Sequence, residues 1–170
     1  MGRALGQFRK NVIRRSLFPK TNLSGALKRM GFVQTDPIRC PARAQDLILR
    51  HRVKNYRAGK LESLYPELPL EEFFLFAYGI GAEKLWEVIH PRGRGRLSDF
   101  EKVVLATVQE YGEMHPRALN KIMRGGRTEN TWGGSSGTTR LALEPLHDRG
   151  VLRVKRRENG IRIYEVARDS

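Results

Sequence analysis

The fold class is decided by the stretch TTRLALEPLHDRGVLRVKRRENGIRIYEV, residues 138–166. Its first part has the apolar spacing of a helix that ends at Gly150. The residues expected on the buried side of this helix are Leu141, Leu143 and Leu146. After Gly150, apolar and polar residues alternate on both sides of a turn at residues 158–160, which predicts a β-hairpin. The stretch therefore predicts a helix followed directly by a two-stranded hairpin.

Two more helices are predicted before this stretch. Ser98 is placed to cap the first, and His115-Pro116 opens the second. One face of the first helix carries Phe100, Val103, Val104, Thr107, Val108 and Tyr111. A glycine-rich loop, in which Trp132 is expected to be an anchor, leads into the third helix. Three helices and a hairpin in this order are typical of a winged helix-turn-helix, whose third helix enters the major groove of DNA.

The first 60 residues also predict three short helices. The first has Leu5, Phe8, Val12 and Ile13 on one face. The second, capped by Thr21 or Asn22 and ended by Gly31, has Leu23, Ala26, Leu27 and Met30 on one face. The third, from Pro41, is expected to have Ala44, Leu47, Ile48 and also Leu49 inward and Arg43, Gln45, Arg50 and Arg52 outward. An extended piece at Phe32-Val33 separates the last two. We therefore expect a mainly α protein with short β-hairpins (α+β), built from tandem winged helix-turn-helix modules. The expected modules are residues 1–92 and 93–170, with the linker HPRGRGRLS at 90–98 between them.

Charge is distributed unevenly along the chain. The sequence has 170 residues, with 32 Lys and Arg against 18 Asp and Glu, a formal net charge of +14. Residues 1–60 hold 15 of the basic residues and only two of the acidic ones, which leaves 17 against 16 in the remainder. A basic half beside a nearly neutral half forms a directed electrostatic surface that suits a polyanion. Together with the helix–hairpin order, this favours double-stranded DNA as the partner.

The expected DNA contacts come from three regions. They are Arg39, Arg43, Arg50 and Arg52 in the N-terminal part, Thr138, Thr139 and Arg140 at the start of the third helix of the second module, and Lys155, Arg156, Arg157 and Arg162 in the hairpin. Alternative interpretations stay open. The hairpin cations can instead form a solvated edge that prevents strand pairing. The basic surface can serve solubility or bind anionic lipid, and winged helices can also bind other proteins.

Several other properties are expected to be absent. No apolar run approaches the roughly 18 residues of a membrane span, and the N-terminus lacks the apolar centre of a signal peptide, so we expect a cytoplasmic, nucleoid-associated protein. The single cysteine, Cys40, cannot form an internal disulfide or a zinc cluster, and is expected to be a small packed residue. His51 and His115 lack metal-ligand company. We therefore expect no metal, no cofactor and a monomer.

Residues 31–62, GFVQTDPIRCPARAQDLILRHRVKNYRAGKLE, closely resemble the N-terminal region of the YcaQ-like crosslink-repair DNA glycosylases. The shared pattern is G-F-hydrophobic-Q-x-D-P-I, then an A-R-A helix and an R-V-x-x-Y segment. Residues 137–166 resemble that family's second winged helix, whereas its C-terminal third is absent from this sequence. The resemblance implies a DNA-repair hydrolase that removes N7-alkylated guanines and unhooks interstrand crosslinks, with Gln34 and Asp36 as catalytic residues. No motif indicates a lysine that forms a Schiff base, so we expect a monofunctional glycosylase.

The pair Gln34 and Asp36 also suits this chemistry on physical grounds. Breaking the glycosidic bond of a cationic base builds positive charge on the deoxyribose, which an ionised carboxylate stabilises while it activates the attacking water. Residues two apart in an extended segment point to the same side, so both side chains can converge on one spot. Taken alone, Asp before Pro37 is typical of a turn. The alternatives are therefore a non-enzymatic winged-helix DNA-binding protein, such as a transcription regulator, or a truncated inactive relative.

Overall fold

The computed structural model describes residues 2–16, 18–90, 95–129 and 135–167. It contains both helices and strands, which confirms the mixed class predicted from the sequence. Trp132, the centre of the predicted linker and the expected module boundary at residue 92 lie outside the described residues. We refer to residues 2–90 as the N-terminal half and to residues 95–167 as the C-terminal half.

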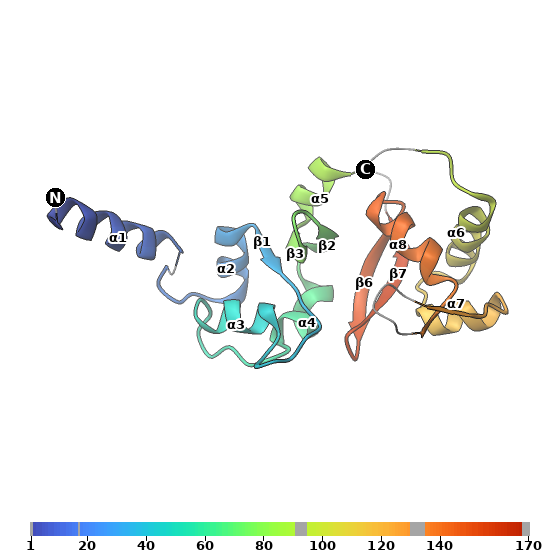
Figure 1. Ribbon diagram of the computed structural model, residues 1–170, viewed down its shortest axis with the longest axis horizontal. Coiled ribbons are helices and arrows are strands. Elements are labelled where there is room, and N and C mark those ends of the chain that lie inside the picture. Colours follow the sequence, from blue (N-terminus) through green and yellow to red (C-terminus); the bar gives the residue numbers. More distant parts are fainter. Residues whose placement is uncertain (1, 17, 91–94, 130–134, 168–170) are drawn as a thin grey trace.

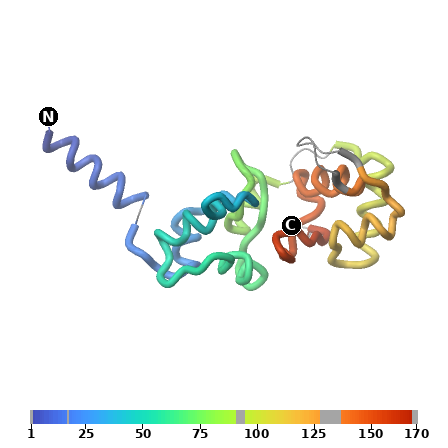
Figure 2. Tube along the Cα trace, turned by 60° about the horizontal axis from the view of Figure 1, so that its bottom comes forward, coloured from blue at the N-terminus to red at the C-terminus, as the bar shows by residue number. Residues whose placement is uncertain are grey.

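Helix α1, Gly2–Ser16, projects away from the rest of the molecule in both views (Figures 1 and 2). None of its residues is buried, although its apolar spacing predicts a packed face. The exposed apolar residues are Leu5, Phe8, Val12 and Ile13. The predicted packing of three N-terminal helices is therefore wrong for α1, because no other described element covers its apolar face.

The second predicted helix is confirmed as α2, Leu23–Met30. The Asn22 side chain caps it by accepting a hydrogen bond from the Gly25 amide, and Gly31 ends it with φ +72°, a conformation that favours glycine. The remaining helices of this half are α3, Ala44–Arg50, α4, Lys60–Leu64, the short 3₁₀ helix η1, Tyr65–Glu67, and α5, Glu83–Ile89.

Helix α3 buries Leu49 as predicted, whereas Ala44, Leu47 and Ile48 are half-buried. It begins at Ala44 rather than Pro41, and its buried residues are Gln45, Asp46 and Leu49. Asp46 can be buried because it accepts hydrogen bonds from the Tyr56 hydroxyl at 2.9 Å and the Gly59 amide at 3.0 Å. Periodicity of apolar residues alone could not reveal this polar interior.

A three-stranded antiparallel sheet completes the N-terminal half. Its order is β1-β3-β2, with β1 at Phe32–Gln34, β2 at Leu70–Phe74 and β3 at Tyr78–Ala82. Phe32 lies opposite Gly81 and Phe73 lies opposite Gly79, and their rings are 5.5 Å apart across the central strand. A Cβ atom on Gly79 would lie 2.2 Å from the Phe32 ring. The glycines of β3 therefore make room for two phenylalanine rings over the sheet.

The C-terminal half has the predicted order of three helices and a hairpin. Helix α6, Asp99–Tyr111, starts with a capping box between Ser98 and Glu101; α7, Pro116–Ile122, is capped by His115; α8 spans Arg140–Asp148. Short strands β4, Arg127–Glu129, and β5, Ser135–Gly137, pair between α7 and α8. The hairpin consists of β6, Leu152–Glu158, and β7, Ile161–Val166, joined by Asn159 and Gly160, both with positive φ as a type I′ turn requires.

The buried faces of two of these helices differ in part from the predicted ones. In α8, Leu143 and Leu146 are buried as predicted, whereas Leu141 is 64% exposed and Ala142 and His147 are buried in addition. In α6 only Val104 and Val108 are buried, while Phe100, Val103 and Tyr111 are exposed. One face of each helix packs in this half, and the neighbouring apolar positions are exposed in the part of the chain that the structure describes.

The hairpin joins the two halves, lying between the sheet of the N-terminal half and helices α6 and α7 (Figure 1). Glu72 of β2 is fully buried and accepts from Arg157 Nε and Nη2 at 2.8 and 2.6 Å, and it also pairs with Arg162. Beside it, Glu71 pairs with Arg153 at 2.6 Å. Burial alone would raise the pKa of Glu72, but the charges of Arg162 and Arg157 outweigh it and hold that pKa below its usual range. The hairpin arginines are thus structural partners of β2.

We expect Glu72→Gln to lower the free energy of unfolding by about 3–5 kcal/mol, because two buried guanidinium groups would lose their counter-charge. The matched control is Glu113→Gln, which breaks a half-exposed ion pair with Arg156 of the same hairpin and should change stability by less than about 1 kcal/mol. Urea unfolding of the three proteins measures the difference. Equal losses in the two variants would contradict the role of Glu72.

Candidate functional site

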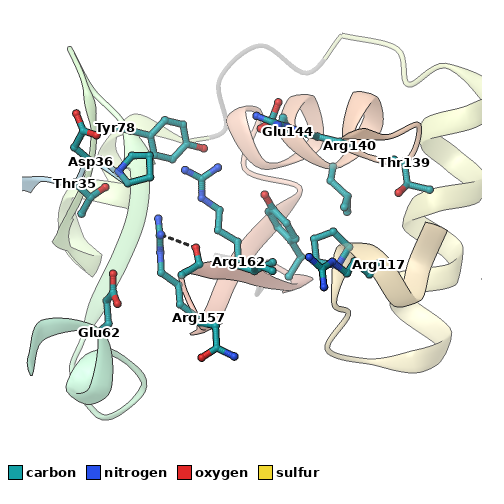
Figure 3. A pocket seen from close by; sticks show the side chains of 18 of the residues that line it. Thr35, Asp36, Glu62, Tyr78, Arg117, Thr139, Arg140, Glu144, Arg157 and Arg162 are labelled. Atoms are coloured by element: carbon teal, nitrogen blue, oxygen red, sulfur yellow. Dashed lines mark hydrogen bonds and ion pairs between the residues drawn. The ribbon is translucent and has the colours of Figure 1, made fainter. Parts of the chain in front are cut away.

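A cleft of about 970 Å³ lies between the two halves of the molecule (Figure 3). One wall comes from the chain around Asp36 and from Tyr78 at the start of β3. The other comes from α7, the start of α8 and the hairpin, with Arg117 and Arg140 on that side. Neither half forms the cleft alone.

The cleft is strongly basic. Its walls carry seven arginines against three carboxylates. The arginines are Arg39, Arg43, Arg117, Arg127, Arg140, Arg157 and Arg162, and the carboxylates are Asp36, Glu62 and Glu144. This excess of positive charge is the arrangement that attracts a polyanion, and the low-dielectric walls concentrate its field.

Asp36 lies at the N-terminal wall, immediately after strand β1. Its Oδ1 accepts a hydrogen bond from the Ile38 amide at 2.8 Å, so the side chain folds back over its own turn. Within the described part of the chain, Oδ2 makes no hydrogen bond or ion pair. One carboxylate oxygen therefore fixes the side chain, and the other has no hydrogen-bond partner among the described residues.

Gln34, the second predicted catalytic residue, does not line the cleft. It is exposed at the end of β1, opposite Gly79. The expected convergence of the two side chains assumes that the chain stays extended, but it turns at Asp36, where the carboxylate caps the Ile38 amide. Thr35, rather than Gln34, reaches the cleft next to Asp36.

A buried polar cluster supports the Asp36 segment from behind. The Asp36 amide donates to Gln45 Oε1 at 3.1 Å, and Gln45 Nε2 donates in turn to Glu62 Oε1 at 3.4 Å. Arg43 binds the same Glu62 oxygen at 2.6 Å and Asp46 at 3.1 Å. Burial alone would lower the pKa of Arg43, but these two carboxylates raise it. The predicted outward position of Arg43 and Gln45 is wrong, because both are needed inside to hold this wall.

Tyr78 connects the cleft to the joint between the halves, by which we mean the ion pairs of Glu71 and Glu72 with the arginines of the β6–β7 hairpin. The Arg162 guanidinium lies 3.9 Å above its ring, and its hydroxyl donates to His147 Nδ1 at 3.0 Å. His147 Nε2 lies 2.9 Å from the Glu72 carbonyl oxygen, so Nε2 carries the proton and Nδ1 accepts. Burial lowers the pKa of His147 to about 4 and raises the pKa of Tyr78. Both rings are therefore neutral at neutral pH, and Arg162 supplies the charge of this wall.

At the opposite wall, Asn120 organises the start of α8. Its Oδ1 accepts from the hydroxyls of Thr138 and Thr139, both at 3.4 Å. Thr139 is buried, while Arg140 is exposed and pairs with Glu144 at 2.8 Å. Of the three residues predicted to contact DNA from this helix, Arg140 is the one with an exposed side chain at the cleft.

The predicted DNA contacts thus divide into two groups. Those at the cleft are Arg39, Arg43, Thr139, Arg140, Arg157 and Arg162, and those outside its lining are Arg50, Arg52, Thr138, Lys155 and Arg156. Arg156 pairs with Glu113 and Glu158, and Lys155 lies 3.4 Å from Glu165. The idea that the hairpin cations form only a solvated edge does not hold for Arg157 and Arg162, which are bound to Glu72.

Sequence reasoning missed several cleft residues. Arg117 lies on α7 and Arg127 on β4. Tyr78 lies at the start of β3, and the tip of the β2–β3 hairpin lacks the Gly, Asn, Asp or Pro that would have predicted a turn there. The guanidinium groups of Arg39 and Arg117 form no ion pair or hydrogen bond with any described residue. A basic residue in the first turn of a helix, where it opposes the helix dipole, was the available signal for Arg117.

Other expectations concern metals, cysteine and membranes. Within the described ranges, no group of three His, Cys, Asp or Glu side chains is placed to hold a metal ion. Cys40 is exposed, not packed as predicted, and His115 has the structural role expected of it, at the cap of α7. No helix in the described part of the chain has the length and apolar character that crossing a membrane requires.

Comparison with known families identifies the relatives of this chain. Residues 27–170 match the family described as DNA glycosylase AlkZ-like. The chain belongs to the AlkZ-like DNA glycosylases. The resemblance found in the sequence is thereby confirmed, and α1 lies before the matched region. AlkZ-like membership implies DNA as the partner and DNA repair as the process. No curated protein and no solved structure matches this chain.

The low pKa of His147 in this AlkZ-like protein predicts an acid-sensitive joint. The folded protein protonates His147 near pH 4 and the unfolded chain near 6.5, so the unfolded state binds more protons between these values. The stability that His147 contributes is therefore complete above pH 6.5 and falls as the pH drops. We expect the difference in unfolding free energy between wild type and His147→Gln to shrink by about 3 kcal/mol from pH 7 to pH 4.

This comparison isolates His147 from Glu71, whose pKa burial raises to about 7, because Glu71 is present in both proteins. Denaturant unfolding at the two pH values measures the difference. A difference that does not change with pH would show that His147 titrates normally.

Proposed function

We propose that this AlkZ-like protein is a monofunctional DNA glycosylase that hydrolyses the N-glycosidic bond of N7-alkylated purines, including those joined in interstrand crosslinks. The observation that carries the proposal is the Asp36 carboxylate at the wall of a cleft lined by seven arginines. The arginines suit the phosphates of duplex DNA, and the carboxylate suits the sugar cation that forms when the base departs.

We further propose that the chain is organised as tandem winged-helix modules, residues 1–92 and 93–170. The order α6-α7-β4-β5-α8-β6-β7, in which three helices are followed by a hairpin, supports this interpretation for the second module. Its hairpin differs from a wing that reaches out to DNA, because Glu72 of the first module binds Arg157 and Arg162. In this arrangement the hairpin closes the back of the cleft, and the phosphate contacts fall to the residues around its mouth.

Among the basic residues of the cleft, the proposed phosphate contacts are Arg39 and Arg117, with Arg140 beside them. The first two are exposed, and their guanidinium groups have no partner among the described residues, so binding a phosphate breaks no internal ion pair. Arg43, Arg157 and Arg162 already neutralise internal carboxylates and contribute mainly through their field.

The proposed reaction follows from the charge of the substrate. An N7-alkylated purine is cationic, so it leaves with the electron pair of the C1′–N9 bond and becomes neutral. Positive charge then develops on the deoxyribose, where Oδ2 of Asp36 stabilises it. Water forms the new bond to C1′, and its proton passes to Asp36 and then to solvent. The products are the free base and an abasic site.

Gln34 is proposed as the partner of Asp36, acting from the rim of the cleft. Its neutral amide can orient the attacking water without adding charge. Because Gln34 is exposed and does not line the cleft, its contribution depends on how DNA closes over the end of β1. We therefore expect Gln34 to contribute less than Asp36.

A second function is favoured by one contact. The hydrogen bond from the Ile38 amide to Asp36 gives this side chain a structural role in the turn. With that role alone, the chain would be a winged-helix DNA-binding protein without enzymatic activity, such as a transcription regulator. The two functions differ in whether the charge of Asp36 matters, because an asparagine retains the oxygen that accepts from Ile38.

We expect wild-type protein to release 7-methylguanine from alkylated duplex DNA, and Asp36→Asn to slow release by on the order of 10²-fold or more, because the charge is lost while the turn is kept. Gln34→Ala should slow it by a smaller factor. Single-turnover release of the base measures the rates, and fluorescence anisotropy measures DNA affinity. No release by wild type, or equal rates for wild type and Asp36→Asn, would exclude the proposed role of Asp36.

We expect DNA affinity to fall steeply as salt is raised, because binding releases counterions from phosphates. Arg117→Gln should reduce the slope of log affinity against log salt by about 1. The control, Arg156→Gln, removes a charge that lies outside the cleft and is paired with Glu113 and Glu158, and should leave the slope nearly unchanged. A slope that responds equally to both substitutions would place the DNA elsewhere.

A further inference from the structure

The tip of the β2–β3 hairpin presents an unusual set of side chains to solvent. Phe74, Leu75 and Phe76 are consecutive and are 45%, 38% and 74% exposed. The tip is closed by a hydrogen bond from the Leu75 amide to the Ala77 carbonyl oxygen at 3.1 Å. Hairpin tips usually carry Gly, Asn, Asp or Pro, which suit the turn and interact with water. Three large apolar side chains at this position therefore need an explanation other than turn formation.

The tip lies directly beside the proposed catalytic segment. Strand β1 pairs with β3 so that Gln34 faces Gly79, and the pairing continues with the Thr35 amide donating to the Tyr78 carbonyl oxygen at 2.8 Å. Tyr78 ends the tip and lines the cleft together with Thr35 and Asp36. Figure 3 shows Tyr78 next to Asp36 at this wall. Phe74, Leu75 and Phe76 do not themselves line the cleft, but the chain that carries them continues into Tyr78 at the end of the cleft where Asp36 stands.

The tip is supported rather than loose. The Phe76 ring packs against Phe32 with centroids 5.4 Å apart, and Phe32 packs in turn on Phe73 at 5.5 Å. Phe74 meets the Tyr78 ring edge-on at 6.1 Å. Rings held from beneath in this way keep their outer faces exposed without a large loss of side-chain freedom on binding. Such an arrangement is suited to contact with a flat, apolar partner.

The residues around the tip indicate which kind of molecule it binds. The arginines of the adjoining cleft attract phosphates, and the flat apolar surfaces found next to phosphates are stacked bases. Phe and Leu side chains are used by DNA-binding proteins as wedges between base steps. A carboxylate that acts at C1′ of a stacked nucleotide also needs the base to be displaced, which leaves a gap in the stack.

We propose that the β2–β3 tip inserts Phe76, which Phe32 supports, into the DNA stack at the step beside Asp36, with Phe74 next to it at the tip. The proposal rests on the proposed function for the position of the target base, but the insertion requires no hydrolysis. In this role Phe76 is a positioning residue: it occupies the space that the displaced base leaves and holds the sugar near the carboxylate. The proposed binding partner of the tip is a base step of duplex DNA.

The experiment uses the full chain and a duplex with an abasic-site analogue flanked by 2-aminopurine, whose fluorescence rises when stacking is lost. We expect wild type to raise the fluorescence at saturation. The double variant Phe74→Ala/Phe76→Ala should lose most of this rise and bind about tenfold more weakly. Phe76→Trp should keep the rise, because another large ring can stack.

The matched control is Val88→Ala on α5, which removes an 82% exposed apolar side chain from another surface and should behave as wild type. Unfolding midpoints close to that of wild type confirm that the variants fold; Phe74 and Phe76 are 45% and 74% exposed, so their removal leaves the buried core intact. A full fluorescence rise in the double variant would overturn the proposal. A second result would also overturn it: wild type is a dimer, the double variant is a monomer, and both give the same fluorescence rise. The tip would then bind a second copy of the chain and not DNA.

The two proposals fail in distinguishable ways. The abasic-site analogue has no base to release, so the fluorescence rise is independent of catalysis, and Asp36→Asn should retain it. A rise that depends on Phe76 in a protein that releases no 7-methylguanine would support the wedge and refute the glycosylase. Release that depends on Asp36, with a rise that is indifferent to Phe76, would do the reverse.

Discussion

The buried carboxylate of Glu72 is the constraint on which the arrangement of this molecule depends. It lies on β2 of the N-terminal half, and its two partners, Arg157 and Arg162, lie on the hairpin of the C-terminal half. A buried charge without partners would cost several kcal/mol, so the hairpin must be docked whenever β2 is buried. The Tyr65 hydroxyl, which donates to the Val154 carbonyl oxygen at 2.9 Å, adds a second polar link across the same joint. The position of one half relative to the other is thus set by polar groups that have few alternative partners.

The cleft is a consequence of this docking. Arg162 forms an ion pair with Glu72, and its guanidinium also lies over the ring of Tyr78. The Tyr78 hydroxyl hydrogen-bonds to His147, and His147 hydrogen-bonds to the carbonyl oxygen of Glu72. The wall that carries Asp36 is therefore connected through a few contacts to the joint that holds both halves. A molecule of DNA bound in the cleft would contact both halves at once. Binding and the stability of the joint are accordingly expected to be linked.

Much of the local structure was predictable, because it depends on interactions between residues that are close in the sequence. The Asn22 and Ser98 caps, the Gly31 stop and the Asn159-Gly160 turn each depend on residues within a few positions of one another. The three-stranded sheet was harder to recognise, because the glycines of β3 serve two distant phenylalanines rather than a turn. The buried faces of α1 and α6 were overestimated, and Leu141 of α8 was wrongly expected to be buried. Periodicity shows which residues share a face, but it does not show whether another element covers that face.

For the candidate site, the sequence by itself determined the family and a hypothesis about the chemistry. It showed an acidic residue in a recognisable context, in a basic chain with a helix–hairpin order, and the match to the AlkZ-like family confirms the chain as a glycosylase relative. Only the tertiary structure decided which arginines face the cleft. Arg157 and Arg162 meet a carboxylate 85 and 90 residues away, whereas Arg117 and Arg39 keep exposed guanidinium groups at the cleft. The physical reason is that a charged side chain takes the partner that folding brings to it. That partner is specified by the packing of distant segments and not by the neighbours along the chain.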